Sequence, residues 1–495
     1  MLLFKKGNYV PDAIMYQIQR KVKEESELQK VENPLGYKSI WRLLASFSGP
    51  TIIATLVYSI YNIVDQVYIG QGVGYLGNAA TTVSFPITTL MSAISLLISA
   101  GGSAYASIRL GEKREDEAER TLSNMLLASL VLGLIYMAVC LLFIKPLLRI
   151  FGTTDEIMPY AMDYAPIILI GTPAMMLASV LANMARTDGA PKISMFGTVL
   201  GAALNAVLDP VYMFVFHWGV RGAAIATITS QYISAAVLLI YFIRKSKNPL
   251  HMRLKRKYLK LDFGLTGSYL KLGISSCVTQ GVGAIMQTIM NNTLRYYGAL
   301  SPVGSEVAIS AVGVVTKVAM VMATFGIGIA NGVQPIFGFN WGAKKYDRVY
   351  EAYRKAACSA VFAIFAMWVV CQIFPEAILS LFGDEEAEFT TFAVHALRII
   401  LFFTFLGGFQ NVSVNYFQST GQVMKATILS LLRQLLVLIP LLLILPRFFG
   451  LDGALYATPV SDVCSTVVVA CFMIPEMRRL KKMIQENSSS NQIQI

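Results

Sequence analysis

Apolar stretches of roughly 20 residues recur twelve times along this chain, between Ser48 and Pro475. A helix of that length crosses about 30 Å of hydrocarbon, whereas a membrane β-barrel would show short alternating segments. The fold class predicted is therefore an all-α integral membrane protein. The predicted spans are residues 48–71, 85–108, 122–145, 159–182, 193–216, 222–243, 271–297, 307–336, 355–375, 390–416, 426–446 and 453–475.

The basic residues predict the orientation, because Lys and Arg collect in cytoplasmic loops. With the N-terminus inside, 33 of the 41 basic residues fall on the inner side and five on the outer side, while Lys317, Arg398 and Arg433 lie within spans. We therefore expect both termini in the cytoplasm. We also expect the chain to be a monomer in the plasma membrane, in contact with its lipid bilayer. The net charge of +12 follows from this topology and predicts no nucleic-acid partner.

The chain repeats itself with an offset of 231 residues. Six spans per copy return the chain to its starting side, so the copies should be related by a pseudo-twofold axis along the membrane normal, with the substrate path between them. The repeated landmarks are Leu-Arg-Ile-Phe151-Gly152 with Leu-Ser-Leu-Phe382-Gly383, Gly111-Glu-Lys113 with Gly342-Ala-Lys344, and Gly219-Val-Arg-Gly222 with Gly450-Leu-Asp-Gly453.

The repeat predicts how the chain divides. Within the N-terminal extension, Asp12–Lys30 suits either a basic amphipathic helix on the inner surface or a solvated tail. The predicted segments are a cytoplasmic polar extension (1–40), an N-lobe with helices 1–6 (41–245), a basic cytoplasmic linker (246–265), a C-lobe with helices 7–12 (266–477) and a cytoplasmic tail (478–495).

Two acidic residues stand inside predicted spans, Asp65 in the first and Asp209 in the fifth. A carboxylate in the bilayer costs about 2.5 to 3.5 kcal/mol, so it is usually paired or functional. At 1.5 Å per residue, both lie about 25 to 27 Å along their helices from the inner side. Asn205 shares a helix face with Asp209, and Thr227 lies at a similar depth. We expect these four side chains to form a site for a proton or a monovalent cation.

The second half lacks this set, since Leu435 and Ile439 replace Asn205 and Asp209 while Thr458 matches Thr227. A difference within a repeat favours a functional role for the first-half residues. The charged residues inside the second half are Asp462, Lys317, Arg398 and Arg433. We interpret these mainly as mutual ion pairs that hold helices together.

The motifs taken together resemble the multidrug and toxic compound extrusion (MATE) family, in its prokaryotic DinF-like or MepA-like branch. The resemblance covers about residues 40 to 480, and its order and spacing are more specific than any single motif. The matching segments are Gly49-Pro50, Asn62-Ile-Val-Asp65 followed by Gly70, Asn183-Met-Ala-Arg186-Thr-Asp-Gly189-Ala-Pro-Lys192, and Asn205-Ala-Val-Leu-Asp209-Pro210.

This resemblance implies a secondary multidrug efflux transporter that exports cationic or amphipathic organic compounds by antiport with H⁺ or Na⁺. It implies ion coupling by Asp65, Asn205, Asp209 and Thr227, a possible Na⁺ site at these four residues, and no other metal or cofactor. The NorM-like branch adds a carboxylate in helix 7, where this chain has Gln280 and Gln287. That departure favours coupling in the first lobe.

The substrate path is predicted from soft and aromatic side chains that suit hydrophobic cations. Ordinary packing explains many residues of these types equally well. The candidates are Tyr58, Tyr61, Tyr164, Asn183, Met184, Gln280, Gln287, Met286 and Met290.

The main alternative function is a lipid-linked oligosaccharide flippase of the same broader superfamily. A flippase would be expected to carry a cationic central cavity, whereas acids mark the first lobe of this chain. An enzyme is not expected, because the three histidines His217, His251 and His395 are scattered and the six cysteines show no metal-ligand spacing. A channel would not need the two-lobed repeat.

Overall fold

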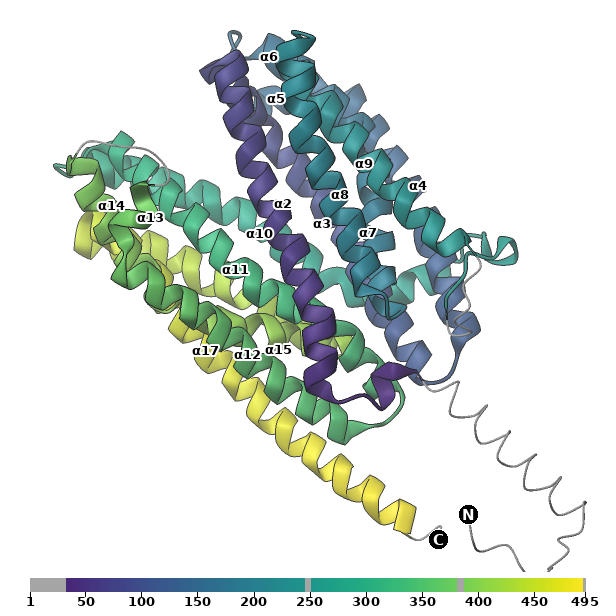
Figure 1. The fold of residues 1–495 in the computed structure, drawn as a ribbon. Coiled ribbons are helices and arrows are strands. Elements are labelled where there is room, and N and C mark those ends of the chain that lie inside the picture. Colours follow the sequence, from purple (N-terminus) through teal and green to yellow (C-terminus); the bar gives the residue numbers. More distant parts are fainter. Residues whose placement is uncertain (1–32, 245–250, 381–386, 493–495) are drawn as a thin grey trace, which may run out of the picture.

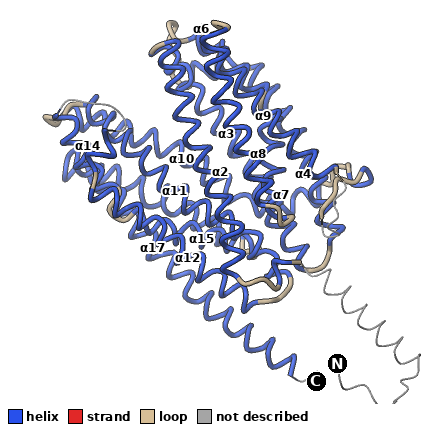
Figure 2. The backbone as a smooth tube through the Cα atoms, in the orientation of Figure 1, coloured by secondary structure: helices blue, strands red, loops and turns tan. Residues whose placement is uncertain are grey.

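The computed structural model describes residues 33–244, 251–380 and 387–492, which form helices and loops with no strand (Figure 2). This confirms the all-α class. Figure 1 shows two helix bundles that meet at one end and diverge toward the other, where α6 and α14 lie. The segment Asp12–Lys30 lies outside the described residues.

The first bundle follows the chain from α2 to α9. Several of its helices begin with a proline in the first turn, where the missing N–H costs nothing. Its elements are α2 (Ile40–Val73), α3 (Tyr75–Gly111), α4 (Glu115–Leu142), α5 (Ile144–Ile150), α6 (Met158–Ile170), α7 (Thr172–Thr187), α8 (Pro191–Pro210), the π-helical turn η2 (Val211–Val215) and α9 (Gly219–Ile243), preceded by the short 3₁₀ turn η1 (Pro34–Gly36).

The second bundle begins after the short turn η3 (Arg256–Tyr258), where the Asp262 carboxylate caps the first helix by accepting hydrogen bonds from two backbone N–H groups. Its elements are α10 (Phe263–Ala299), α11 (Ser305–Gly342), α12 (Tyr346–Ile373), α13 (Pro375–Leu379), α14 (Ala387–Ile400), η5 (Thr404–Leu406), α15 (Gly407–Ser419), α16 (Val423–Leu431), the π-helical turn η6 (Leu432–Leu438) and α17 (Ile439–Gln492).

Within the described residues, eight helices are long and apolar enough to span a membrane, or ten if each of two bent pairs is one span. The polar helix α10 is not among them, and the last helix counts once although Gly450, with φ of 60°, divides it. Counting α10 and both parts of that helix, the arrangement agrees with the twelve predicted spans.

Two predicted spans are broken instead of continuous. Residues 159–182 form α6 and α7, which are bent by 45°, and residues 390–416 form α14 and α15, which are bent by 41°. At the first break, Gly171 is followed by Pro173, which cannot donate to the helix ladder. Continuous hydropathy did not reveal these bends.

The repeat is visible in the backbone. Lys113 and Lys344 both have positive φ, at 60° and 55°, and they are 231 residues apart. Gly219 and Gly450 keep the same offset, with φ of 54° and 60°. Left-handed backbone is uncommon for lysine, so its recurrence at equivalent positions shows that the two halves share local geometry and not only composition.

The bundles meet where α3 crosses α11. A Cβ atom at Gly111 would overlap the carbonyl oxygen of Phe339, and one at Gly342 would overlap that of Ile108. Both pairs are related by the 231-residue offset, so the contact is reciprocal. Glycine is therefore required here for the two backbones to approach, as at other close helix crossings in membranes.

We expect Gly342→Ala to lower the thermal stability of the protein, because overpacking at a backbone contact costs about 1 to 3 kcal/mol. The matched control is Gly313→Ala in the same helix, since a Cβ at Gly313 has no neighbour within 4 Å. Thermal unfolding in detergent should separate the two variants. Equal stability of both would contradict the proposed role of the crossing.

The linker between the bundles is held against the first bundle by a buried histidine. His251 Nδ1 lies 2.5 Å from Asp188 Oδ2, and its Nε2 lies 3.2 Å from the Tyr241 carbonyl oxygen. Asp188 also accepts hydrogen bonds from the Tyr241 hydroxyl (2.6 Å) and from the backbone N–H of Met252 (2.7 Å). Because both ring nitrogens face acceptors, the protonated imidazole satisfies both contacts.

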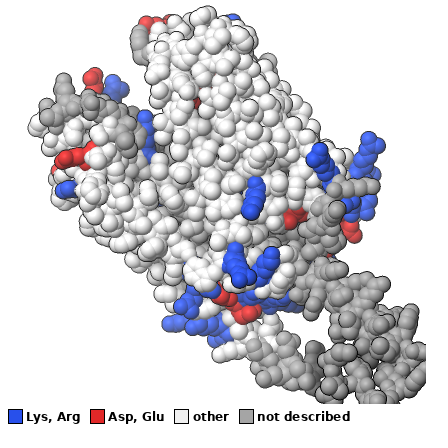
Figure 3. All heavy atoms as spheres, viewed as in Figure 1, with Lys and Arg blue, Asp and Glu red and all other residues white. Residues whose placement is uncertain are grey.

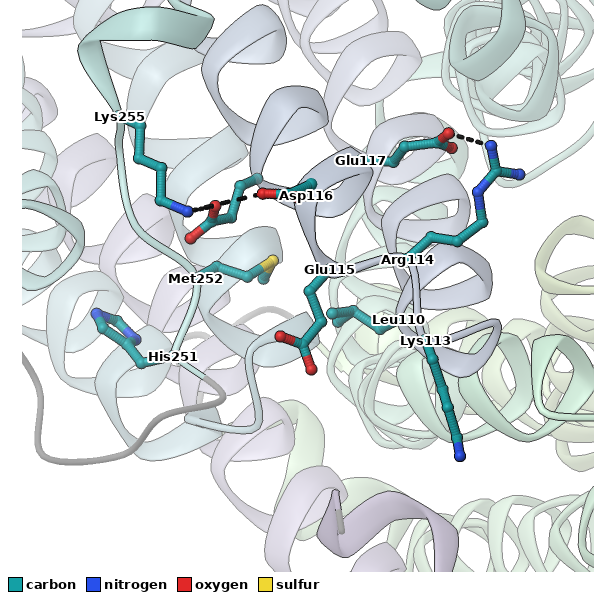
Figure 4. Close-up of a pocket in the computed structure, with 10 residues that line it drawn as sticks. Leu110, Lys113, Arg114, Glu115, Asp116, Glu117, His251, Met252 and Lys255 are labelled. Carbon is teal, nitrogen blue, oxygen red and sulfur yellow. Dashed lines mark hydrogen bonds and ion pairs between the residues drawn. The ribbon is translucent and has the colours of Figure 1, made fainter. Parts of the chain in front are cut away.

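The linker continues along the first turn of α4. Figure 4 shows Lys255 beside Asp116 in a pocket of about 530 Å³ that His251 and Met252 also line. Lys255 forms an ion pair with the Glu119 carboxylate, and the backbone N–H of Arg253 donates to Glu119 at 3.2 Å. These contacts hold the linker, and with it the start of the second bundle, against α4 of the first bundle.

We expect the stability that His251 contributes to fall as pH rises. The Asp188 carboxylate raises the pKa of His251 above 6.5, against the opposing effect of burial. A pKa raised by folding stabilises the protein below the unfolded value, and this contribution is lost as pH rises through the folded value. The difference in unfolding temperature between wild type and His251→Gln should shrink with rising pH. A constant difference would contradict this interpretation.

Candidate functional site

Asp65 lies on α2 with its side chain turned into the first bundle. Only 8% of the residue is exposed, although the helix around it is apolar and long enough to span a bilayer. α2 packs against both α8 of its own bundle and α11 of the other. The carboxylate therefore lies in a helix that contacts both halves of the molecule.

Asp209, Asn205 and Thr227 form one hydrogen-bonded group. The Asn205 amide Nδ2 donates to Asp209 Oδ1 at 3.2 Å and to Thr227 Oγ1 at 3.2 Å. Asn205 and Asp209 are one turn apart on α8, while Thr227 reaches them from α9. Asp209 is fully buried. The structure thus brings together the three residues that helix spacing predicted to meet.

The Asp65 carboxyl group lies beside that of Asp209, close enough for the two to interact directly. The buried oxygens Asp65 Oδ1, Asp209 Oδ2 and Asn205 Oδ1 have no hydrogen-bond partner among the described residues. No described Lys, Arg or His forms an ion pair with either acid. Two unpaired carboxylates in one buried site repel each other, so a proton or a cation is required between them.

Two tyrosines border this pair of acids. Tyr164 on α6 lies close to both Asp65 and Asp209, and Tyr61 lies close to Asp65 one turn earlier on α2. The rings of Tyr58 and Tyr61 meet edge to face with centroids 5.1 Å apart. The structure therefore places Tyr61 and Tyr164 next to the acids, while Tyr58 contacts Tyr61 and is partly exposed.

Asn183 and Met184 lie elsewhere, in the last turns of α7. Asn183 Oδ1 accepts a hydrogen bond from Arg186 at 2.6 Å, and Arg186 also donates to Ser194 at 3.0 Å. Met184 is fully buried in the apolar core that joins the bundles. Asn183 thus holds Arg186, which joins α7 to α8, and Met184 fills the core. The place of Asn183 and Met184 on a substrate path stays a prediction.

The four candidates on α10 have different surroundings. Gln280 is exposed, and Gln287 donates to Asn291 of the same helix at 3.1 Å. Met286 and Met290 pack against the apolar core of the second bundle. The structure does not bring these residues to the acidic site by any contact among the described residues.

Sequence reasoning missed the π-helical turn η2, which follows Asp209 and Pro210 directly. Such turns are rare and often occur at functional sites. Pro210 was the available signal, because a missing N–H disturbs the hydrogen-bond ladder of the next turn. The interpretation of the second-half charges as ion pairs holds for Arg433 and Asp462. Lys317 and Arg398 are exposed instead.

Comparison with known proteins agrees with this arrangement. The MatE family pattern matches residues 50–211 and 281–444. The multidrug export protein MepA of Staphylococcus haemolyticus (strain JCSC1435) is 28% identical over 445 residues, which cover 89% of this chain and 94% of that protein. MepA of Staphylococcus aureus (strain N315) is 26% identical over 446 residues, with the same coverage of both chains.

Solved structures with the same fold include the MATE multidrug transporter DinF-BH, which was solved as a complex with a ligand. It is 32% identical, with a TM-score of 0.80, and the match covers 88% of this chain and 95% of that one. A MATE in complex with MaL6 has a TM-score of 0.85 at 22% identity, covering 91% and 99%.

These matches account for the two-bundle fold. The matched family is one of transporters, so the protein is not an enzyme. Its apolar helices make it a multi-pass protein of the plasma membrane. The chain belongs to the MatE family of multidrug efflux transporters.

Proposed function

We propose that this protein, acting as a monomer, exports cationic or amphipathic organic compounds by antiport with H⁺ or Na⁺. The ion-coupling residues in this proposal are Asp65, Asn205, Asp209 and Thr227. The observation that carries it is the pair of buried carboxylates, which have no basic partner in the described part of the chain. Such a pair is stable only when a proton, a metal cation or an organic cation compensates its charge.

Antiport requires that ion and drug exclude each other. Tyr61 and Tyr164 lie beside Asp65, so an organic cation near these rings would be attracted by the same charge that attracts the ion. Uptake of the ion removes that attraction and releases the drug. Because coupling is reciprocal, drug binding must weaken ion binding by the same factor.

The shape of the molecule supports alternating access. The bundles are in contact where α3 crosses α11, at Gly111 and Gly342, and they diverge at the opposite end (Figure 1). With the N-terminus inside, as the basic residues predict, the divergent end faces outward. Figure 3 agrees in part, since many of the visible Lys and Arg side chains gather at the closed end. Rocking at the glycine contact would then expose the site to each side in turn.

The flippase alternative is less well supported. Its substrates carry phosphate, whereas the buried unpaired charge of the first bundle is negative. The relatives named multidrug export protein also favour efflux of drugs.

We expect Asp65→Asn to reduce coupled efflux to background while leaving membrane insertion intact. The amide keeps the shape of the side chain but cannot exchange a proton or balance Na⁺. Efflux should be measured in vesicles with separate H⁺ and Na⁺ gradients, which also identifies the coupling ion.

The control for that measurement is Asp163→Asn, because Asp163 is a partly exposed carboxylate at the bundle end, paired with Arg221 at 2.7 Å. It should retain efflux. Drug resistance at the wild-type level in cells that express Asp65→Asn normally would rule out the coupling role.

Asn205→Ala and Thr227→Ala should weaken ion dependence more than drug affinity. Each removes one ligand or hydrogen bond from the acidic site, worth about 0.5 to 1.5 kcal/mol, so the half-saturating ion concentration should rise about two- to tenfold. Thr458→Ala, at the equivalent position of the second half, is the control. If the variants change only which drugs are exported, these residues belong to the substrate wall instead.

A further inference from the structure

The second bundle has a polar centre of its own in the corresponding pair of helices. Arg433 Nε lies 3.0 Å from Asp462 Oδ1, which joins η6 to α17. Asp462 is fully buried, whereas 37% of the Arg433 side chain is exposed. The two sites thus differ in charge, since Arg433 pairs with the acid of the second bundle, whereas no described basic residue pairs with Asp65 or Asp209 in the first.

The depth of Arg433 shows what its exposed part must face. It lies ten residues after the start of α16 at Val423, or about 15 Å along the helix, near the middle of a bilayer about 30 Å thick. Its Nη1 lies 3.9 Å from the position of a Cβ at Gly407 on α15, so the guanidinium points into the bundle. A guanidinium that faces hydrocarbon at this depth costs about 2.5 to 3.5 kcal/mol on insertion scales, which favours contact of its exposed part with water or a polar ligand.

The ion pair leaves most of the guanidinium unused. Arginine has five N–H donors, and Nε provides only one of them. Neither oxygen of Asp462 receives a hydrogen bond of good geometry from a described residue. A pair that served only to tie two helices together would be expected to use both guanidinium edges and both carboxylate oxygens.

The backbone around Arg433 resembles that around the acidic site. The π-helical turn η6 (Leu432–Leu438) contains Arg433, and η2 follows Asp209 in the equivalent helix of the first half. The Arg433 carbonyl accepts a hydrogen bond from the Ser461 hydroxyl at 2.9 Å, outside the helix ladder. Both halves therefore depart from regular helix beside their charged residue, as functional sites in helices often do.

We propose that Arg433 binds the carboxylate or another anionic group of a transported compound. Asp462 is a positioning residue that holds the guanidinium by one edge and leaves the other edge free. This inference rests on the proposed efflux function and defines its substrate class more narrowly. Zwitterionic amphipathic compounds would bind with their anionic group at Arg433, while compounds with only a positive charge would not use it.

The test compares two ligands that differ in one charge, a rhodamine with a free benzoate group and the methyl ester of the same dye. The main variant is R433Q/D462N, which removes both charges together so that neither is left buried alone. K317Q, at an exposed basic residue of a membrane helix in the same bundle, is the control. Binding constants are measured by fluorescence polarisation with the full chain in lipid nanodiscs.

R433Q/D462N should weaken binding of the acid dye by about tenfold, as the loss of a charged hydrogen bond predicts, and should leave the ester unchanged. K317Q should affect neither dye. A parallel loss for both dyes, or no loss for either, would overturn the role of Arg433 and leave the efflux proposal standing. If the wild type binds neither dye and exports neither from vesicles, the efflux proposal fails, and this inference with it.

Discussion

Two carboxylates in one buried site constrain this protein more than any other feature. Asp65 and Asp209 come from different helices, are almost inaccessible and have no basic partner among the described residues. Their repulsion favours a bound proton or cation, because the described residues provide no fixed countercharge. Tyr61 and Tyr164 lie beside this unbalanced charge.

The two halves share local backbone geometry but carry different charged residues. Positive φ recurs at Lys113 and Lys344, and a π-helical turn recurs in the fifth and eleventh predicted spans. In the first half the acids remain uncompensated, whereas in the second Arg433 compensates Asp462 internally. The repeat provides the architecture of two bundles, and the substitutions within it decide which bundle holds buried acids without a basic partner among the described residues.

Glycine determines how the halves meet. Besides the crossing of α3 and α11, a Cβ at Gly101 would overlap the Tyr269 carbonyl, and one at Gly273 would overlap that of Leu97, where α3 crosses α10. These contacts bring backbone against backbone, so the two bundles approach closely along α3. The linker beside α4 keeps the bundles joined at that end.

The sequence by itself determined the helical membrane fold, the twelve spans and the repeat, because hydropathy and a constant offset can be read along the chain. It also placed Asn205 and Asp209 on one helix face, whereas their meeting with Asp65 and Thr227 was predicted from depth and depends on helix packing. It did not reveal the breaks at Gly171 and after Ile400, or that Arg433 pairs with Asp462 while Lys317 is exposed. Those features depend on which helices become neighbours. Only the tertiary structure decides that, since the packing of residues far apart in the chain fixes which charges meet.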